Sequence, residues 1–389
     1  MLSLFFHFFV TRWQHPLNTF AAVKSITVFL KKEMNKVFSF IALAFLGCGS
    51  AAAQQVNVSN VQRPKLVVGI VVDQMRWDYL YRYQKRYGEG GFKRLLNEGF
   101  SCENTRIPYV PSVTAIGHTC LYTGSVPSIH GIAGNNFVKN GKKVYCTDDE
   151  TVKPVGSNSK AGLMSPRNLW VTTLGDEMKI ASNGRAKVVG VALKDRASIL
   201  PAGHNPNGAY WFDDESGKFI TSSYYINQLP KWVDAFNNQH LPERYLSEKW
   251  NTLYPENTYV ESTEDENEYE DGIRKGMKAT LPLNLPALYK KYGYSIIRKT
   301  PFGNSLTIDL AKAAVDGEQL GADDETDLLA VSCSSTDYIG HQVGTHAVET
   351  EDTYLRLDKA IAGFLSFLDE KVGKGNYLVF LLSLIHISE

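Results

Sequence analysis

Carboxylate and imidazole side chains occur at positions whose spacing suits a metal ion. Asp337 and His341 are four residues apart, so on a turn of helix both side chains would face one way and could hold one ion. Asp73 directly follows an apolar run, where an Asp can also serve as a helix cap. Together, the three residues form a carboxylate and imidazole set of the kind that binds zinc.

A hydroxyl group that could act as a nucleophile lies between these positions. Thr114 follows the loop 111–113 and begins a segment that we predict to be helical. The unpaired N–H groups and the positive dipole end of a helix favour an anion at such a place. A Thr there can also be an ordinary N-cap without any chemistry, so the residue type alone leaves both roles open.

The elements that must position these residues follow from the hydrophobic pattern. Long apolar, β-branched runs predict strands that are buried on both faces of a parallel sheet; they are 65–72, 187–193, 327–332 and 377–382. Helical periodicity covers 78–98, which ends at Gly99, and 350–370. The alternation predicts an α/β fold, with a mostly parallel sheet sandwiched by helices.

Ligands of such sheets bind at the carboxyl ends of the strands. Lys194 and Arg196 follow the strand 187–193 directly, as Asp73 follows 65–72. The stretch from about 205 to 305 breaks the rhythm of strands and helices, because it is rich in Asn, Pro and aromatic residues. We expect it to be an insertion that caps one edge of the sheet.

The N-terminal region has the pattern of an export signal. Within 34–53 a basic segment is followed by an apolar run and then by small residues, as in a secretory signal peptide. This predicts a secreted or periplasmic protein. Residues 1–33 precede a signal that has its own Met, so we interpret them as a spurious extension.

Composition excludes some classes of partner. Lys plus Arg number 41 and Asp plus Glu number 41, so no excess of positive charge favours a nucleic acid. No stretch after residue 55 approaches the roughly 20 apolar residues of a membrane span. The cysteines beyond the signal show no C-x-x-C spacing, and the sequence does not pair them.

Several ordered motifs carry a resemblance to a known family. The segments 72–76, 111–114, 123–136 and 335–341 resemble those of the alkaline phosphatase superfamily, and most closely its secreted zinc alkaline phosphatases with a threonine nucleophile. The resemblance covers about residues 62–383. It implies two zinc ions in the intact enzyme and phosphate monoesters as substrates.

The resemblance also assigns roles to individual residues. It implies one zinc ion on Asp337 and His341, a second on Asp73 and the Thr114 oxygen, and a phosphate group contacted by Asn135, Lys194 and Arg196. The motif spacing favours Asn135 over its neighbour Asn136. Thr114 would form a covalent phosphothreonine intermediate.

Two alternatives within and outside this family remain open. A nucleotide pyrophosphatase/phosphodiesterase of the same superfamily is the first. Lys194 and Arg196 argue against it, because a monoester has more anionic oxygens for them to neutralise than a diester has. The second is a non-catalytic remnant that binds phosphate or metal.

The sequence departs from the family pattern after 377–382. The pattern requires an Asp-His pair there, both of them ligands of the zinc ion beside Thr114, and the chain has Leu384 and Ile385 instead. His386 is one position late and lacks the carboxylate. We interpret 384–389 as an anomalous tail, and we expect this chain to be a truncated and inactive fragment. The physiological substrate and the oligomeric state do not follow from the sequence.

Overall fold

The computed structural model describes residues 63–103, 105–274 and 276–384. The predicted extension 1–33, the signal peptide 34–53 and most of the tail lie outside these residues, so those interpretations stay predictions. Within the described part of the chain, no helix is long and apolar enough to cross a membrane.

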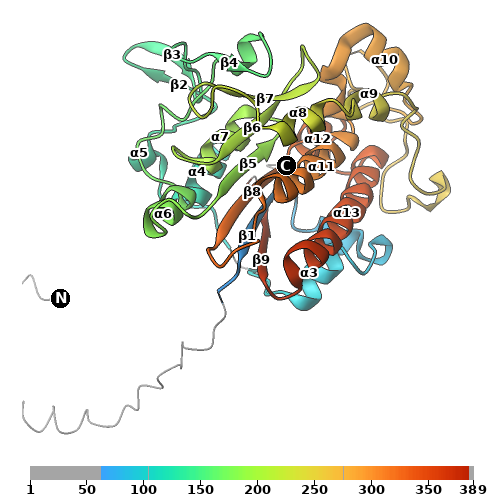
Figure 1. The fold of residues 1–389 in the computed structure, drawn as a ribbon. Helices are drawn as coiled ribbons and strands as arrows, with labels where there is room; N and C mark the ends of the chain where they lie inside the picture. The colour runs from blue at the N-terminus through green and yellow to red at the C-terminus, as the bar shows by residue number, and fades with distance from the viewer. Residues whose placement is uncertain (1–62, 104, 275, 385–389) are drawn as a thin grey trace, which may run out of the picture. The chain divides into compact units, whose positions relative to one another are not determined.

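A seven-stranded sheet forms the centre of the fold, in the order β4-β7-β6-β5-β8-β1-β9 (Figure 1). Its parallel strands are β6 (Gly208–Asp213), β5 (Val188–Ala192), β8 (Asp327–Cys333), β1 (Leu66–Val72) and β9 (Tyr377–Leu382). The antiparallel strands β7 (Lys218–Ser222) and β4 (Pro154–Val155) extend one side. The predicted α/β fold with a mostly parallel sheet is therefore confirmed, as are its four predicted strands.

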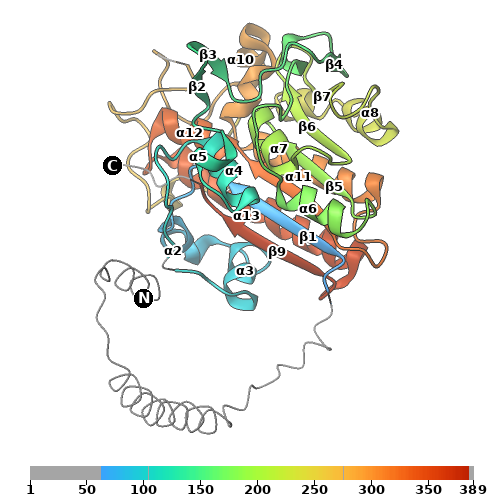
Figure 2. The same cartoon turned by 90° about the vertical axis from the view of Figure 1, so that its left-hand side faces the viewer.

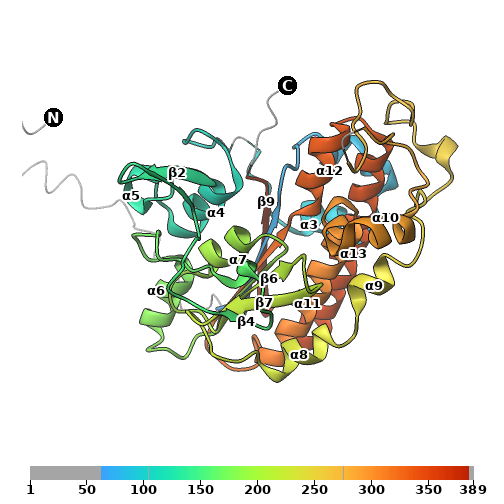
Figure 3. The same cartoon turned by 90° about the horizontal axis from the view of Figure 1, so that it is seen from above.

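Helices cover both faces of the sheet (Figures 2 and 3). One face carries α4 (Thr114–Thr123), α6 (Leu174–Ala181) and α7 (Asp195–Ala202), and the other carries α11 (Phe302–Glu318) and α13 (Val348–Leu368). The remaining short elements are α5 (Pro127–His130), β2 (Asn136–Lys139), β3 (Lys142–Tyr145), η3 (Lys160–Gly162), η4 (Glu256–Thr258), α12 (Ser335–Val343) and the π-helical turn η6 (Asp369–Gly373).

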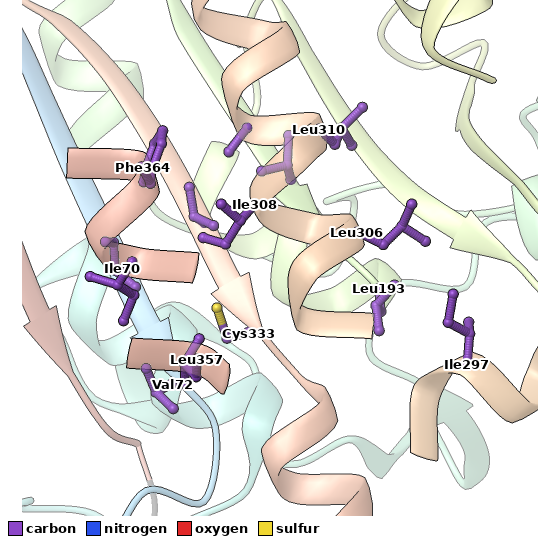
Figure 4. Packing of buried hydrophobic residues seen from close by; sticks show 14 of the residues in the cluster. Ile70, Val72, Leu193, Ile297, Leu306, Ile308, Leu310, Cys333, Leu357 and Phe364 are labelled. Atoms are coloured by element: carbon purple, nitrogen blue, oxygen red, sulfur yellow. The ribbon is translucent and has the colours of Figure 1, made fainter. Parts of the chain in front are cut away.

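Alternate residues of β1 enter two separate hydrophobic clusters. Ile70 belongs to the large cluster that includes Leu310 of α11 and Phe364 of α13 (Figure 4). Val71 instead packs in a smaller cluster with Tyr122 of α4. Because both faces of the strand are buried, the sequence shows a continuous apolar run rather than alternation.

The predicted helix 78–98 is wrong as a single element. The chain forms α2 (Tyr79–Arg82), a 3₁₀ turn (Gln84–Arg86) and α3 (Phe92–Glu98). The break is tertiary in origin: the carboxylate of Asp358 on α13 accepts the backbone N–H groups of Gly88 and Phe92, both at 2.8 Å. A Cβ at Gly91 would lie 2.2 Å from that carboxylate, so only glycine fits there. The predicted end at Gly99 is confirmed.

The stretch 205–305 differs from the expected insertion at its beginning. Residues 208–222 form β6 and β7, which are strands of the central sheet. All six residues of β6 are buried, and the aromatic run 210–212 lies within it. The rest of the stretch includes α8 (Lys231–Asn237), α9 (Leu241–Tyr245), α10 (Leu285–Tyr292) and the 3₁₀ helix η5 (Gly293–Lys299). A capping role therefore concerns only the part after β7.

The cysteines of the described residues are free thiols. Cys102 is exposed, Cys120 is partly buried, and Cys146 and Cys333 are buried. Burial raises the pKa of the Cys120 thiol to about 11.

Candidate active site at the carboxyl edge of the sheet

Three neighbouring parallel strands bring the predicted site residues together. β5, β8 and β1 are adjacent, so their carboxyl ends meet at one edge of the sheet. Lys194 follows β5, Asp337 lies in the first turn of α12 after β8, and Asp73 follows β1. Residues that are more than 100 positions apart in the chain thus share one small volume.

The ammonium group of Lys194 lies between the two carboxylates. Its Nζ atom is 2.5 Å from Asp73 Oδ2 and 2.5 Å from Asp337 Oδ2, and the residue is only 1% exposed. Burial lowers the pKa of Lys194, but the attraction of both carboxylates outweighs it, so the pKa is raised above its ordinary value. The other oxygen of Asp73, Oδ1, is buried and accepts no hydrogen bond from the described residues.

Thr114 directs its hydroxyl into this charged cluster. The residue is the first of α4, and the N-cap position belongs to Val113, with no side-chain capping bond. The Thr114 hydroxyl donates instead to Asp73 Oδ2 at 3.1 Å, and Lys194 Nζ is 3.4 Å from the same Oγ1 atom. The structure therefore does not support a capping role for Thr114.

Asp337 and His341 face the same way on α12. His341 Nε2 is 3.2 Å from Asp337 Oδ1, and Gln74 Nε2 lies 3.4 Å from His341 Nδ1. The hydrogen bond that His341 donates to Asp337 raises the pKa of His341 above its ordinary value, although burial opposes this shift. The i, i+4 spacing in the sequence thus correctly placed both side chains on one side of a helix.

Asn135 and Arg196 flank the cluster. Asn135 Oδ1 accepts the backbone N–H of Ala115 at 3.0 Å, at the N-terminus of α4, whereas Asn136 is exposed and begins β2. Arg196, in the first turn of α7, donates from Nη1 to the hydroxyl of Tyr145 at 2.9 Å. Its Nε atom is buried and, within the part of the chain that the structure describes, has no hydrogen-bond partner.

Two side chains of this region were not foreseen from the sequence. The hydroxyl of Tyr145 accepts from Arg196 and donates to Asp195 Oδ1 at 3.0 Å, so it holds the guanidinium in place. Gln74 reaches His341 from the residue after Asp73. Neither a lone Tyr nor a lone Gln belongs to a spacing pattern, so no sequence signal identifies them.

Leu384 packs against the helix that carries Thr114. The residue is 1% exposed and shares a hydrophobic cluster with Tyr122 of α4. A Cβ added at Gly117, one turn beyond Thr114, would lie 2.8 Å from Leu384 Cβ. An apolar side chain therefore lies near Thr114, at the position where the family pattern requires a carboxylate.

The donor atoms of the site fit zinc in type but not in number. Asp73, Asp337, His341 and the Thr114 hydroxyl supply the oxygen and nitrogen donors that zinc accepts. Within the part of the chain that the structure describes, however, no three His, Cys, Asp or Glu side chains group closely enough to hold a metal ion. The described residues alone therefore complete neither of the two implied zinc sites.

Comparison with known proteins identifies a matching family and similar proteins. Residues 67–383 match the family described as type I phosphodiesterase / nucleotide pyrophosphatase. Alkaline phosphatase PafA of Elizabethkingia meningoseptica is 59% identical over 336 residues, which cover 86% of this chain and 61% of that protein. Alkaline phosphatase PhoV of Synechococcus elongatus is 56% identical over 354 residues, which cover 88% and 64%.

The fold is similar to that of a solved relative. The crystal structure of wild-type alkaline phosphatase PafA matches with a TM-score of 0.81 and 60% identity, over 82% of this chain and 62% of that one. The chain thus spans less than two thirds of the length of these relatives. The matched family and the identity over most of the chain show that it belongs to the type I phosphodiesterase / nucleotide pyrophosphatase family, within the alkaline phosphatase superfamily.

Proposed function

We propose that this chain carries the nucleophile and the phosphate-binding groups of a phosphate monoester hydrolase, an exported alkaline phosphatase that works through Thr114. The observation that carries the proposal is the Thr114 hydroxyl, which points at Asp73 and Lys194 rather than capping its helix. Relatives named alkaline phosphatase support it. So does the solved variant of PafA in which a Thr, an Asn, a Lys and an Arg are replaced, the same residue types as Thr114, Asn135, Lys194 and Arg196.

The proposed reaction has two steps. Thr114 Oγ1 forms a bond to phosphorus while the ester oxygen leaves, and water later cleaves the phosphothreonine to release phosphate. Lys194 and Arg196 would neutralise the non-bridging phosphoryl oxygens, where most of the negative charge lies in a loose transition state. A monoester dianion has more such charge than a diester, so these cations favour monoesters.

Zinc enters this proposal as the family's metal. Asp337 and His341 would ligate one ion, and Asp73 with Thr114 Oγ1 the other. Zinc normally takes about four donors, or three plus water, and the described residues offer two to each ion. We therefore expect the chain to bind zinc weakly and to hydrolyse no phosphate ester above the background of free zinc.

A double substitution tests this account of the metal site. Leu384→Asp with Ile385→His would restore the ligand types at the positions where the family pattern requires them. We expect the variant to bind about one zinc ion per chain tightly, with Asp73 and the Thr114 oxygen completing the set. Tight binding of two ions by the parent chain, with turnover, would show that the ligands are wrongly assigned.

The reaction itself is tested in the same variant. With zinc present, 4-nitrophenyl phosphate should be hydrolysed faster than bis(4-nitrophenyl) phosphate, and Thr114→Ala should abolish both the turnover and any covalent phosphate label. A label that persists without the Thr114 hydroxyl would exclude it as the nucleophile. Zinc binding is measured alongside, so that a lost metal is not mistaken for a lost nucleophile.

Two other functions are outcomes of this experiment. The name of the matched family favours a phosphodiesterase, and faster hydrolysis of the diester would support that function instead. Binding of phosphate and zinc without any turnover in the double variant would support a non-catalytic binding module.

A further inference from the structure

A polar pocket of about 360 Å³ lies beside the site. It is lined by Lys194, Asp195, Arg196, Asp214, Arg274, Ser295, Arg298, Lys299 and Tyr338. Its volume is at the lower end of the range of about 300–1,000 Å³ that is typical of small-ligand sites. Four of its residues, from Arg274 to Lys299, belong to the segment after β7.

The pocket is continuous with the proposed phosphate site. Lys194 and Arg196 line it, and both are proposed to contact the phosphoryl group. The ring of Tyr338 is close to two of its cations, with its centroid 4.9 Å from Lys194 Nζ and 5.9 Å from the guanidinium carbon of Arg298. A molecule held at Lys194 could therefore extend past Tyr338 into the pocket.

Part of the positive charge in the pocket is neutralised by the chain itself. Lys194 has Asp73 and Asp337 at 2.5 Å, and Arg298 has Asp214 at 2.6 Å. Arg298 also donates to two backbone carbonyl groups, at 2.8 Å each, so its role is structural. Asp195 lies near Arg196 and is linked to it through Tyr145.

Arg274 and Lys299 differ, because neither has a carboxylate partner among the described residues. Arg274 donates to Ser295 Oγ at 3.2 Å, and its Nε atom is buried and has no hydrogen-bond partner among the described residues. Lys299 donates to the carbonyl of Ile273 at 2.6 Å and to Gln342 Oε1 at 3.2 Å. Burial and the repulsion of Arg274 lower the pKa of Lys299 below its ordinary value. Two like charges thus face one pocket.

We infer that this pocket binds a second anionic group, a phosphate or a carboxylate, on the same substrate molecule whose phosphoryl group lies at Lys194 and Arg196. An oxyanion there would neutralise both cations, Arg274 and Lys299, that lack a carboxylate partner among the described residues. The inference rests on the proposed function and predicts that the site prefers phosphate monoesters that carry a further negative group.

The test measures binding to the chain rather than turnover. Calorimetry compares n-propyl phosphate with straight-chain diol bisphosphates of two to six carbons, and with phosphorylated hydroxy acids of the same lengths. We expect one length of the bisphosphate or carboxylate series to bind about tenfold more tightly than the monophosphate. This gain in affinity should be smaller at high salt. Binding of inorganic phosphate is measured in a separate titration.

Matched variants decide where the second group binds. Arg274→Gln and Lys299→Met should each remove most of the gain, whereas Lys231→Met, which changes an exposed lysine outside the pocket, should keep it. Thermal unfolding confirms that each variant is folded. Equal affinity for one and two anionic groups at every length would overturn the inference, as would a gain that survives both pocket variants. Two inorganic phosphate ions per chain without any gain would mean that the pocket holds free phosphate instead.

If the proposed function is wrong, the binding measurements should give a different result. If Lys194 and Arg196 do not hold the phosphoryl group, then Lys194→Met and Arg196→Gln should leave the affinity for n-propyl phosphate unchanged. The pocket variants do not alter those residues, so the two results can be separated.

Discussion

The charged cluster at the strand ends and the basic pocket beside it contain cations in opposite situations: Lys194 is buried, whereas Arg274 and Lys299 are half-buried. At the strand ends, Lys194 has two carboxylates at 2.5 Å, and its ammonium group is neutralised by the chain. In the pocket, Arg274 and Lys299 have no carboxylate partner within the described residues, and they repel each other. Lys194 belongs to both regions, because it also lines the pocket.

The difference distinguishes charges that stabilise the fold from charges that remain available to bind a ligand. A charge that burial removes from water is costly unless it is paired, whereas a half-buried cation keeps part of its hydration and can be left for a counter-ion. The buried cation of the strand-end cluster is paired with two carboxylates, and removing it should harm the fold. The pocket is not balanced, and removing one member should harm ligand binding more than stability.

Glu349 on α13 adds a third case. Its side chain is 1% exposed, and both of its oxygens are buried without hydrogen-bond partners among the described residues. It lines a small cavity with apolar residues such as Trp250 and Ile339, and with Lys299 and Gln342. Burial raises its pKa to about 8. A buried acid without a partner can therefore lose its negative charge by taking up a proton.

Removing the cation of the strand-end cluster should change stability more than any other substitution considered. Lys194→Met keeps the length of the side chain but leaves the carboxylates of Asp73 and Asp337 buried without a cation. We expect the free energy of unfolding of the metal-free chain to fall by about 3–5 kcal/mol. Urea unfolding measures it, with Lys231→Met as the control. A loss below about 1 kcal/mol would show that water already solvates the cluster.

Stability should also depend on pH through Glu349. Between its ordinary pKa of 4.5 and about 8, the unfolded chain releases this proton while the folded chain keeps it, so stability falls as pH rises through this window. In Glu349→Gln, the decrease in the free energy of unfolding over this pH range should be smaller by about 3 kcal/mol. Urea midpoints at pH 5, 6, 7 and 8 measure the difference between parent and variant.

A neighbour on the same helix serves as the control for this prediction. Glu351 is also buried, but it accepts from Arg86 NH1 at 2.5 Å. Glu351→Gln should lower stability across the same pH range, because it removes a paired charge. A parent pH profile that Glu349→Gln leaves unchanged would show that Glu349 is hydrated.

Removing the Thr114 hydroxyl should have a smaller effect on stability. Thr114→Val keeps the shape of the side chain and deletes one hydrogen bond to Asp73. The expected loss is about 1 kcal/mol, since Lys194 still neutralises that carboxylate. A much larger loss in thermal unfolding would mean that Thr114 has a structural role as well.

The smallest effect is expected in the unbalanced pocket. Arg274→Gln removes one of two like charges, so stability should stay the same or rise by about 0.5 kcal/mol at low salt. Urea unfolding at low and high salt measures this difference. A clear loss of stability would show that a group on the chain neutralises Arg274. The two regions would then not differ in this respect.

Much of the candidate site followed from local patterns. Asp73 and Lys194 were placed correctly because the carboxyl ends of neighbouring parallel strands meet at one edge. Asp337 and His341 were placed by their helical spacing. The roles of these residues in binding zinc or phosphate remain proposals.

Other features escaped prediction because they depend on distant contacts. The periodicity of 78–98 predicts one helix, but Asp358, some 270 residues further along the chain, binds the backbone at Gly88 and Phe92. The aromatic run 210–212 is too short to separate a strand from a loop by its pattern, and only pairing with β5 makes it β6.

Local patterns of apolar and polar residues are enough to specify the class of fold and the chemical types that gather at one edge, because buried strands and the residues that end them are recognisable from a few neighbouring positions. Three features depend instead on the folded chain: Lys194 lies between two carboxylates, Thr114 points at Asp73 instead of capping α4, and Arg274 and Lys299 share a pocket with Arg196. Such pairings join residues that are far apart in the chain. Their distances are set by the order of the strands and the packing of the helices, which no local pattern records.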